Sequence, residues 1–239
     1  MTESRSEMPV AARLSLVIVG FLVVCGLVGF WVVGFLRTGP ATVTPRVVST
    51  SAGPQVYLHM QTMGTYGSGP RPSWVSYMVQ DAQGHWVHST IVQLPAHATV
   101  HVTVDQYDSA GLLRNPEWAQ VKGTIGGSAN YTGVVGSKTY SNPTALSLVG
   151  ASAAAHTFAV PALGINVPLA GISSDAKNVC NAAPCTTSST HDTITFTFKT
   201  GAPHVYHWQC FIPCGLGFVN GNGGPMQTVG YMMGFLKVV

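Results

Sequence analysis

The sequence predicts an all-β sandwich preceded by one membrane-spanning helix. Residues 14–36 contain no charged side chain, and a helix of that length spans a hydrocarbon core of about 30 Å. The rest of the chain contains many short segments in which apolar and polar residues alternate between glycines and prolines, which is typical of sandwiches and barrels. Hydrophobic residues make up 46% of the chain, which is enough to form a packed core and to exclude intrinsic disorder.

The apolar segment 14–36 is interpreted as an uncleaved transmembrane helix. The alternative, a signal peptide, has a shorter apolar region of about 7 to 15 residues and a small-residue cleavage site, and no clear site follows here. Trp31 lies near one end, where an interfacial aromatic residue is expected. Two arginines flank each end, so the positive-inside rule does not decide the orientation. The paired cysteines described below decide it, together with the simplest topology for a single anchor followed by about 200 residues. That topology leaves residues 1–13 in the cytoplasm and the rest outside the cell membrane, as a single-pass protein.

Residues 37–54 are rich in proline, glycine, serine and threonine, and they predict an extended linker. An exoplasmic domain then covers residues 55–239. Within it, the segments 193–199 (TITFTFK) and 99–104 (TVHVTV) alternate cleanly, so each predicts a half-buried strand. Further strands are predicted at residues 74–79, 86–92 and 205–208, and a short helix is predicted near 115–121.

Charged residues are scarce, at 8% of the chain against roughly 25% in an ordinary soluble domain. The net charge of +3 is too small to suggest a nucleic-acid surface. Eight acidic residues offer little for paired acid–base catalysis, and the sequence lacks nucleophile-elbow, zinc-protease, P-loop and dinucleotide motifs. The composition therefore predicts no nucleic-acid partner and indicates no independent catalytic site.

Four cysteines form two close pairs after the apolar segment. Cys180 and Cys185 lie in a polar loop without nearby histidine or methionine, and they predict a local disulfide, which agrees with an oxidising compartment. Cys210 and Cys214 lie close in sequence to a histidine and precede a loop with methionines. Soft ligands of these types select copper, but the spacing equally permits a second disulfide.

Two segments carry a family resemblance. His156 begins HTFAVPALG, and the cysteines Cys210 and Cys214 lie in YHWQCFIPCG. These segments resemble the copper-binding segments of cupredoxins, most closely those of cytochrome c oxidase subunit II. The strand TFTFKTG and the closing MMGFLKVV extend the resemblance over about residues 145–239. It implies a cupredoxin-like Greek-key β-sandwich with one or two copper ions at one end.

The resemblance also implies a ligand set. His156 would supply an imidazole, Cys210 and Cys214 would supply thiolates, and Ile212 would offer its backbone carbonyl. The family places a second histidine four residues after the second cysteine, and this chain has Phe218 there. A standard dinuclear centre therefore cannot be assembled from the matched positions alone.

A methionine is expected to complete the site. If Lys237 faces solvent on the last strand, Met232 shares the inward face with Leu236 and is the preferred candidate. Met226 could approach on the glycine-rich loop that precedes it. Core packing of either methionine is the alternative.

These features favour a membrane-anchored copper protein that transfers electrons in a respiratory chain. Its partners would be other subunits of a terminal oxidase or a redox protein. Two alternatives remain open. One is a Cu(I)-binding or copper-delivery protein, because cysteine, methionine and a single histidine suffice for Cu(I). The other is a metal-free interaction module held together by two disulfides.

Overall fold

The computed structural model describes residues 8–37, 39–69, 71–109, 115–133, 138–141, 154–214 and 224–239. The chain divides into two units, residues 1–39 and 40–239, which are described separately. The first unit contains the helix α1 (Val10–Arg37). Residues 10–34 of α1 have a mean hydropathy of 2.8 and are long and apolar enough to cross a membrane. Their apolar side chains are exposed around the helix, which is the arrangement that lipid would cover.

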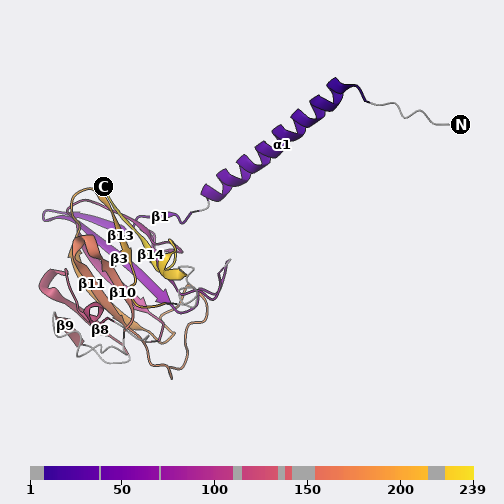
Figure 1. Cartoon of the computed structure of the whole chain (residues 1–239). Helices are drawn as coiled ribbons and strands as arrows, with labels where there is room; N and C mark the ends of the chain where they lie inside the picture. The colour runs from indigo at the N-terminus through magenta and orange to yellow at the C-terminus, as the bar shows by residue number, and fades with distance from the viewer. Residues whose placement is uncertain are drawn as a thin grey trace. The chain divides into compact units, whose positions relative to one another are not determined.

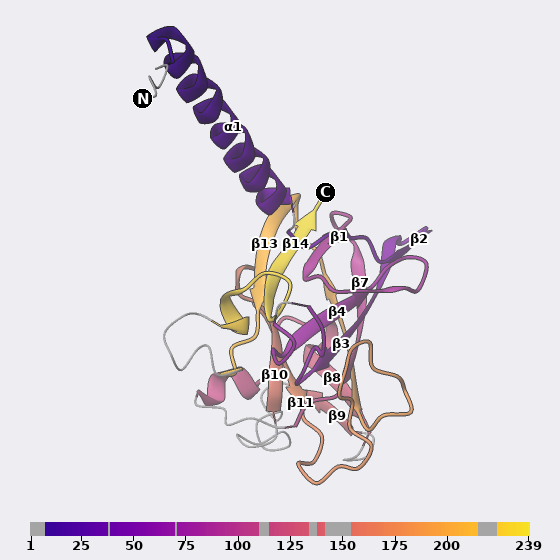
Figure 2. The same cartoon turned by 90° about the vertical axis from the view of Figure 1, so that its right-hand side faces the viewer.

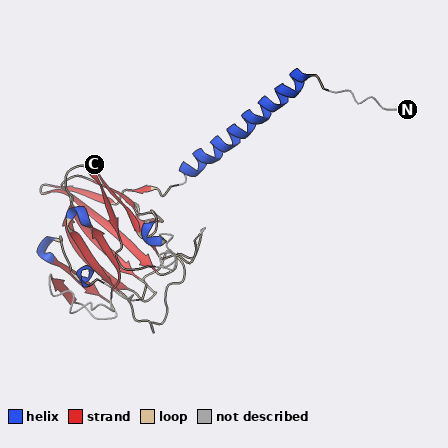
Figure 3. Ribbon diagram, in the orientation of Figure 1, coloured by secondary structure: helices blue, strands red, loops and turns tan. Residues whose placement is uncertain are grey.

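The second unit is a sandwich of two mixed sheets, so the predicted all-β sandwich is confirmed (Figures 1, 2 and 3). The first sheet has six strands in the order β1-β6-β14-β13-β10-β11. Its two parallel pairs are β1 with β6 and β6 with β14, and its other pairs are antiparallel. The strands are β1 (Thr42–Val43), β6 (Ile91–Leu94), β10 (Ala154–Val160), β11 (Ile165–Ala170), β13 (His204–Gln209) and β14 (Met233–Val238).

The second sheet has eight strands, in the order β5-β4-β3-β7-β12-β8-β9, with β2 paired to β3. The central pair β3 and β7 is parallel, and the others are antiparallel. The strands are β2 (Arg46–Thr50), β3 (Gly53–Met63), β4 (Ser76–Gln80), β5 (Trp86–Val87), β7 (Thr99–Gln106), β8 (Ser128–Thr132), β9 (Lys138–Ser141) and β12 (Asp192–Lys199). Short 3-10 helices connect strands at Pro116–Ala119, Ile125–Gly127, Pro161–Leu163 and Pro225–Gln227.

The core lies between the facing sheets and is rich in aromatic rings. Phe158 on β10 lies with its ring centroid 5.5 Å from Phe196 and 6.2 Å from Phe198, both on β12 of the other sheet. Trp208 on β13 is fully buried and lies 5.2 Å from Phe158. Burial of large apolar side chains is the main favourable term in folding, and here it packs β10 of the first sheet against β12 of the second.

The sequence prediction of alternating strands is confirmed at 193–199 and 99–104, where the apolar residues are buried and the threonines are half-buried. The predicted strand 86–92 is wrong as a single element. It divides into β5 in one sheet and β6 in the other, and the chain changes sheets between them. The Ser89 hydroxyl donates to the carbonyl of Ala41 and the Thr90 hydroxyl donates to that of Met233, which fix this crossing.

The segment expected to be a linker contains two strands. Residues 42–43 pair with β6, and residues 46–50 pair with the first part of β3. Every residue of β2 is exposed, so burial does not hold it in place. Backbone pairing along an exposed sheet edge accounts for its position, and a composition rich in threonine and valine permits that pairing.

The Cys180–Cys185 disulfide is present. It lies beside a second, smaller cluster of buried apolar residues that is formed by Met63, Met78, Tyr107 and Cys185. The backbone N–H of Cys185 donates to Oε1 of Gln61 on β3, at 2.6 Å. The bridged loop is therefore attached to β3 by a buried hydrogen bond and by apolar packing.

Candidate metal centre

Three side chains from the resemblance converge at one place in the sandwich. The ligand atoms of His156, Cys210 and Cys214 all lie within 4.8 Å of one another, and all three residues are buried. The His156 Nδ1 atom lies 3.1 Å from Cys214 Sγ and 3.9 Å from Cys210 Sγ. Residues more than 50 positions apart in the chain thus form one nitrogen-and-sulfur cluster.

The strand β10 positions the histidine through an irregularity in its pairing. Ala154 pairs with Ala170 of β11, but His156 pairs with Leu169, so the register shifts between them. A bulge of this kind changes the direction in which a side chain points, and bulges are frequent beside functional sites. The Tyr77 hydroxyl donates to the carbonyl of Thr157 at 3.2 Å and supports the strand from β4.

The loop after β13 positions the cysteines. The backbone N–H of Cys210 donates to the carbonyl of Met232, at 2.9 Å, which continues the pairing of β13 with β14. The Thr157 N–H donates to Cys210 Sγ at 3.4 Å, and its hydroxyl accepts from Phe211 N–H at 2.8 Å. The strand that carries His156 therefore also holds the first cysteine.

Two other predicted ligand atoms lie near the cysteines, one within the cysteine loop and one on Met226. The carbonyl oxygen of Ile212 lies 2.9 Å from Cys214 Sγ and 3.5 Å from Cys210 Sγ. The backbone N–H of Cys214 donates to the thioether sulfur of Met226, at 3.3 Å. Both atoms are thus near the cluster, although their role as ligands stays a prediction.

Met232 faces inward as its parity predicts, because it and Leu236 are fully buried while Lys237 is partly exposed. Its backbone carbonyl holds Cys210. Among the described residues, the thioether that contacts the cysteine loop is that of Met226. Met226 and Met232 are both buried in the same core cluster as the two cysteines, and the choice between them as a ligand stays a prediction.

Cys210 and Cys214 are separate thiols, with their sulfur atoms 3.4 Å apart. A disulfide bond measures about 2.05 Å, so the second disulfide that the spacing permitted is not formed here. Phe218, which stands where the family has its second histidine, lies outside the described residues.

Burial alone would lower the pKa of His156. Its hydrogen bonds to Asp108 and Cys210 and their negative charges outweigh that effect and raise the pKa to about 9. Burial would raise the pKa of Cys210, but hydrogen bonds from Cys214 and His156 hold it well below its usual range. The hydrogen bond that Cys214 donates to Cys210, together with burial, raises the pKa of Cys214. The contacts within the cluster and with Asp108 therefore shift the pKa values of all three residues.

Asp108 is the site residue that the sequence analysis did not identify. It follows β7, and its Oδ2 accepts from His156 Nε2 at 3.1 Å. A cavity of about 140 Å³ adjoins the cluster; its lining includes Asp108, His156 and Cys214. Nothing in the sequence links Asp108 to a histidine 48 positions later.

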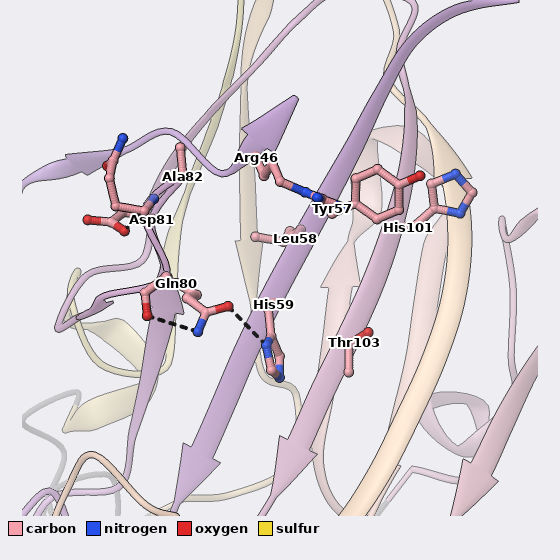
Figure 4. Close-up of a pocket in the computed structure, with 11 residues that line it drawn as sticks. Arg46, Tyr57, Leu58, His59, Gln80, Asp81, Ala82, His101 and Thr103 are labelled. Atoms are coloured by element: carbon pink, nitrogen blue, oxygen red, sulfur yellow. Dashed lines mark hydrogen bonds between the residues drawn. The ribbon is translucent and has the colours of Figure 1, made fainter. Parts of the chain in front are cut away.

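A second polar region lies on the outer face of the other sheet, in a groove of about 450 Å³ (Figure 4). His59 on β3 lies between the Asp105 carboxylate, at 2.8 Å, and the Gln80 side-chain oxygen, at 3.2 Å. Tyr57 stacks on His101, with ring centroids 5.2 Å apart. These histidines are not part of the cluster that His156 forms with Cys210 and Cys214.

Comparison with known proteins gives matches among solved structures only. No protein-family profile and no curated protein matches the chain. The chain is similar to a chain of a heme-copper terminal oxidase dimer, with 14% identity over 96% of this chain and 98% of that one, at a TM-score of 0.35. It is also similar to rusticyanin from Thiobacillus ferrooxidans, with 16% identity over 84% and 86% of the two chains, at a TM-score of 0.33. At these values the similarities identify no function.

Proposed function

We propose that this protein binds copper through His156, Cys210 and Cys214, and that the bound copper transfers single electrons. The observation that carries the proposal is the convergence of one imidazole nitrogen and two sulfurs, all buried, within 4.8 Å. Thiolate and imidazole donors suit copper, whereas calcium and magnesium require oxygen ligands. The Ile212 carbonyl and the Met226 thioether are the further donors that we assign to the site.

Copper in such a site would supply a one-electron redox couple. The protein residues hold the donors in place and exclude water. His156 is 2% exposed, and Cys210 and Cys214 are 0% and 5% exposed. A rigid and dry ligand set suits electron transfer, because little has to move when the charge of the metal changes. The strands β10 and β13 supply that rigidity, since Phe158 and Trp208 pack them into the core.

The apolar helix α1 supports a location in the cell membrane, with residues 40–239 exposed outside the cytoplasm. The Cys180–Cys185 disulfide supports an oxidising compartment for the sandwich. We further propose a role in a respiratory chain, beside the subunits of a terminal oxidase or a soluble redox partner.

Copper delivery is the second candidate function. It is favoured by the donor set itself, because two thiolates and one imidazole satisfy the low coordination number of Cu(I) without a second histidine. A delivery protein would bind Cu(I) and give no strong thiolate-to-copper absorption in air, whereas an electron-transfer protein would give that absorption in its oxidised form.

The test is a copper titration of the full chain in detergent, with Cu(I) under anaerobic conditions and then oxidation. Strong visible absorption after oxidation supports electron transfer. Binding of colourless Cu(I) alone supports delivery. Full copper uptake by both His156→Ala and Cys210→Ala would show that the metal lies elsewhere. His59→Ala is the matched control, because it removes a histidine from the outer groove and should leave copper uptake unchanged.

A further inference from the structure

The imidazole of His156 has two differently occupied nitrogens. Nδ1 faces the sulfur atoms, 3.1 Å from Cys214 Sγ, while Nε2 lies 3.1 Å from Oδ2 of Asp108. A carboxylate that accepts from one ring nitrogen leaves the other nitrogen's lone pair for a metal and fixes the plane of the ring. Asp108 is the carboxylate in contact with the cluster among the described residues.

Asp108 is itself held by a network that fixes its carboxylate. Oδ1 accepts from the Ser109 N–H at 2.8 Å, which leaves Oδ2 for the histidine. The Asp108 backbone N–H donates to Gln106 Oε1 at 2.9 Å, and the Gln106 amide donates back to the Asp108 carbonyl at 2.7 Å. The Ile172 N–H donates to the same carbonyl at 3.1 Å. These hydrogen bonds restrict both the backbone and the carboxylate of Asp108.

A glycine on the neighbouring segment leaves the space that Asp108 occupies. A Cβ atom added at Gly64 would lie 2.6 Å from Asp108 Oδ1 and 2.9 Å from its Cγ. Both distances are shorter than van der Waals contact, so any larger residue at position 64 displaces the carboxylate. Gly64 directly follows the last residue of β3. Its φ lies outside the left-handed region, so the backbone conformation alone does not require glycine there.

We propose that Asp108 is the positioning residue of the metal centre: it orients His156 so that Nδ1 is the nitrogen offered to copper. The proposal rests on the proposed copper site and adds a residue that the family resemblance does not supply. Without the carboxylate, the ring can turn about its side-chain bonds and present either nitrogen to the cavity. Partners of this type typically contribute 10–100-fold to metal affinity.

The test compares four variants of the full chain in detergent. Asp108→Ala removes the acceptor. Asp108→Asn keeps an acceptor oxygen and removes the charge. Gly64→Ala leaves the Asp108 residue unchanged but pushes its carboxylate out of position. Asp105→Asn is the matched control, because Asp105 makes the same kind of pair with His59 on the outer face, at 2.8 Å.

Two readouts are measured. The first is the Cu(I) dissociation constant, by competition with a chromophoric chelator. We expect Asp108→Ala and Gly64→Ala to weaken binding by about 10–100-fold, Asp108→Asn to weaken it less, and the control to stay within about twofold of the wild type. The second readout uses the metal-free protein. A protected Nε2 proton of His156 should be visible by nitrogen-15 NMR, persist in Asp108→Asn and disappear in Asp108→Ala.

Wild-type copper affinity in a folded Asp108→Ala variant would overturn the proposal, whatever the NMR spectrum shows. If the wild type binds no copper, the proposed function fails, and the NMR readout alone then decides on Asp108. Loss of the protected proton in Asp108→Ala would still support control of His156 by Asp108. Retention of that proton would refute it. A far-ultraviolet spectrum and melting temperature establish that each variant is folded.

Discussion

Replacement of Phe158 by alanine tests whether the aromatic core holds the strand that carries His156. The Phe158 side chain is fully buried, and its ring lies 5.2 to 6.2 Å from those of Trp208, Phe196 and Phe198. Removal of a buried phenylalanine side chain typically costs about 3–5 kcal/mol. For a domain of this size, that corresponds to a fall in melting temperature of about 6–20 °C. Because Phe158 packs β10 against the second sheet here, copper binding should weaken as well.

The assay is thermal unfolding of the metal-free full chain, followed by tryptophan fluorescence and near-ultraviolet circular dichroism. Val205→Ala on β13 is the control, since Val205 is 54% exposed and its truncation should change stability by no more than about 0.5 kcal/mol. A loss below about 1 kcal/mol for Phe158→Ala would refute the packing of the sheets described above, as would an equal loss in the control.

Three further predictions concern the outer groove, the disulfide and the methionine. In the groove, burial lowers the pKa of His59, but Asp105 and Gln80 outweigh it and raise the pKa; burial likewise raises the pKa of Asp105, but His59 lowers it overall. The ionised Asp105 thus stabilises the fold at pH values above its unfolded pKa of about 3.9. The protonated His59 stabilises the fold at pH values below its unfolded pKa of about 6.5. Asp105→Asn should lower the free energy of unfolding most between these values, by an amount on the order of 1 kcal/mol after solvent screening, and less as the pH rises through the raised pKa of His59. An effect that does not change with pH would contradict this. Replacement of Cys180 and Cys185 by alanine should cost about 2 kcal/mol in thermal unfolding, from the entropy of so short a loop, and leave copper affinity intact; a loss of copper would show that the loop belongs to the site. Met226→Leu should shift the visible spectrum of the copper form at nearly unchanged stability, since leucine and methionine have similar volumes; an unchanged spectrum would remove Met226 from the ligand set.

Much of the fold follows from local alternation. In β12 and β7, each apolar residue is two positions from the next, so their inner faces could be assigned from the sequence alone. The same parity predicted that Met232 faces inward. The donor residues His156 and Cys210 were found through their family resemblance, because no local pattern records a contact across more than 50 positions.

Other features depend on tertiary contacts that a local pattern does not record. The pairing of residues 42–50 with the sheets is one, since their composition resembles a linker. The change of sheet between β5 and β6 is another, because it depends on the carbonyls that Ser89 and Thr90 meet. Asp108 could not be found because its role arises from its contact with His156. The contact of the Met226 sulfur with the Cys214 N–H is a further one that strand parity does not record.

The measurement that tests the copper assignment most directly is the copper content of the purified full chain after reduction, copper loading and desalting, beside Cys210→Ser and the Cys180/Cys185 double alanine variant. The account predicts copper in the wild type and in the double variant, and little or none in Cys210→Ser. It also predicts two free thiols in the sandwich, Cys210 and Cys214, which react with a thiol reagent once the metal-free protein is denatured. Copper-free wild-type protein, or equal copper in Cys210→Ser, would contradict the assignment of this cluster as a metal centre.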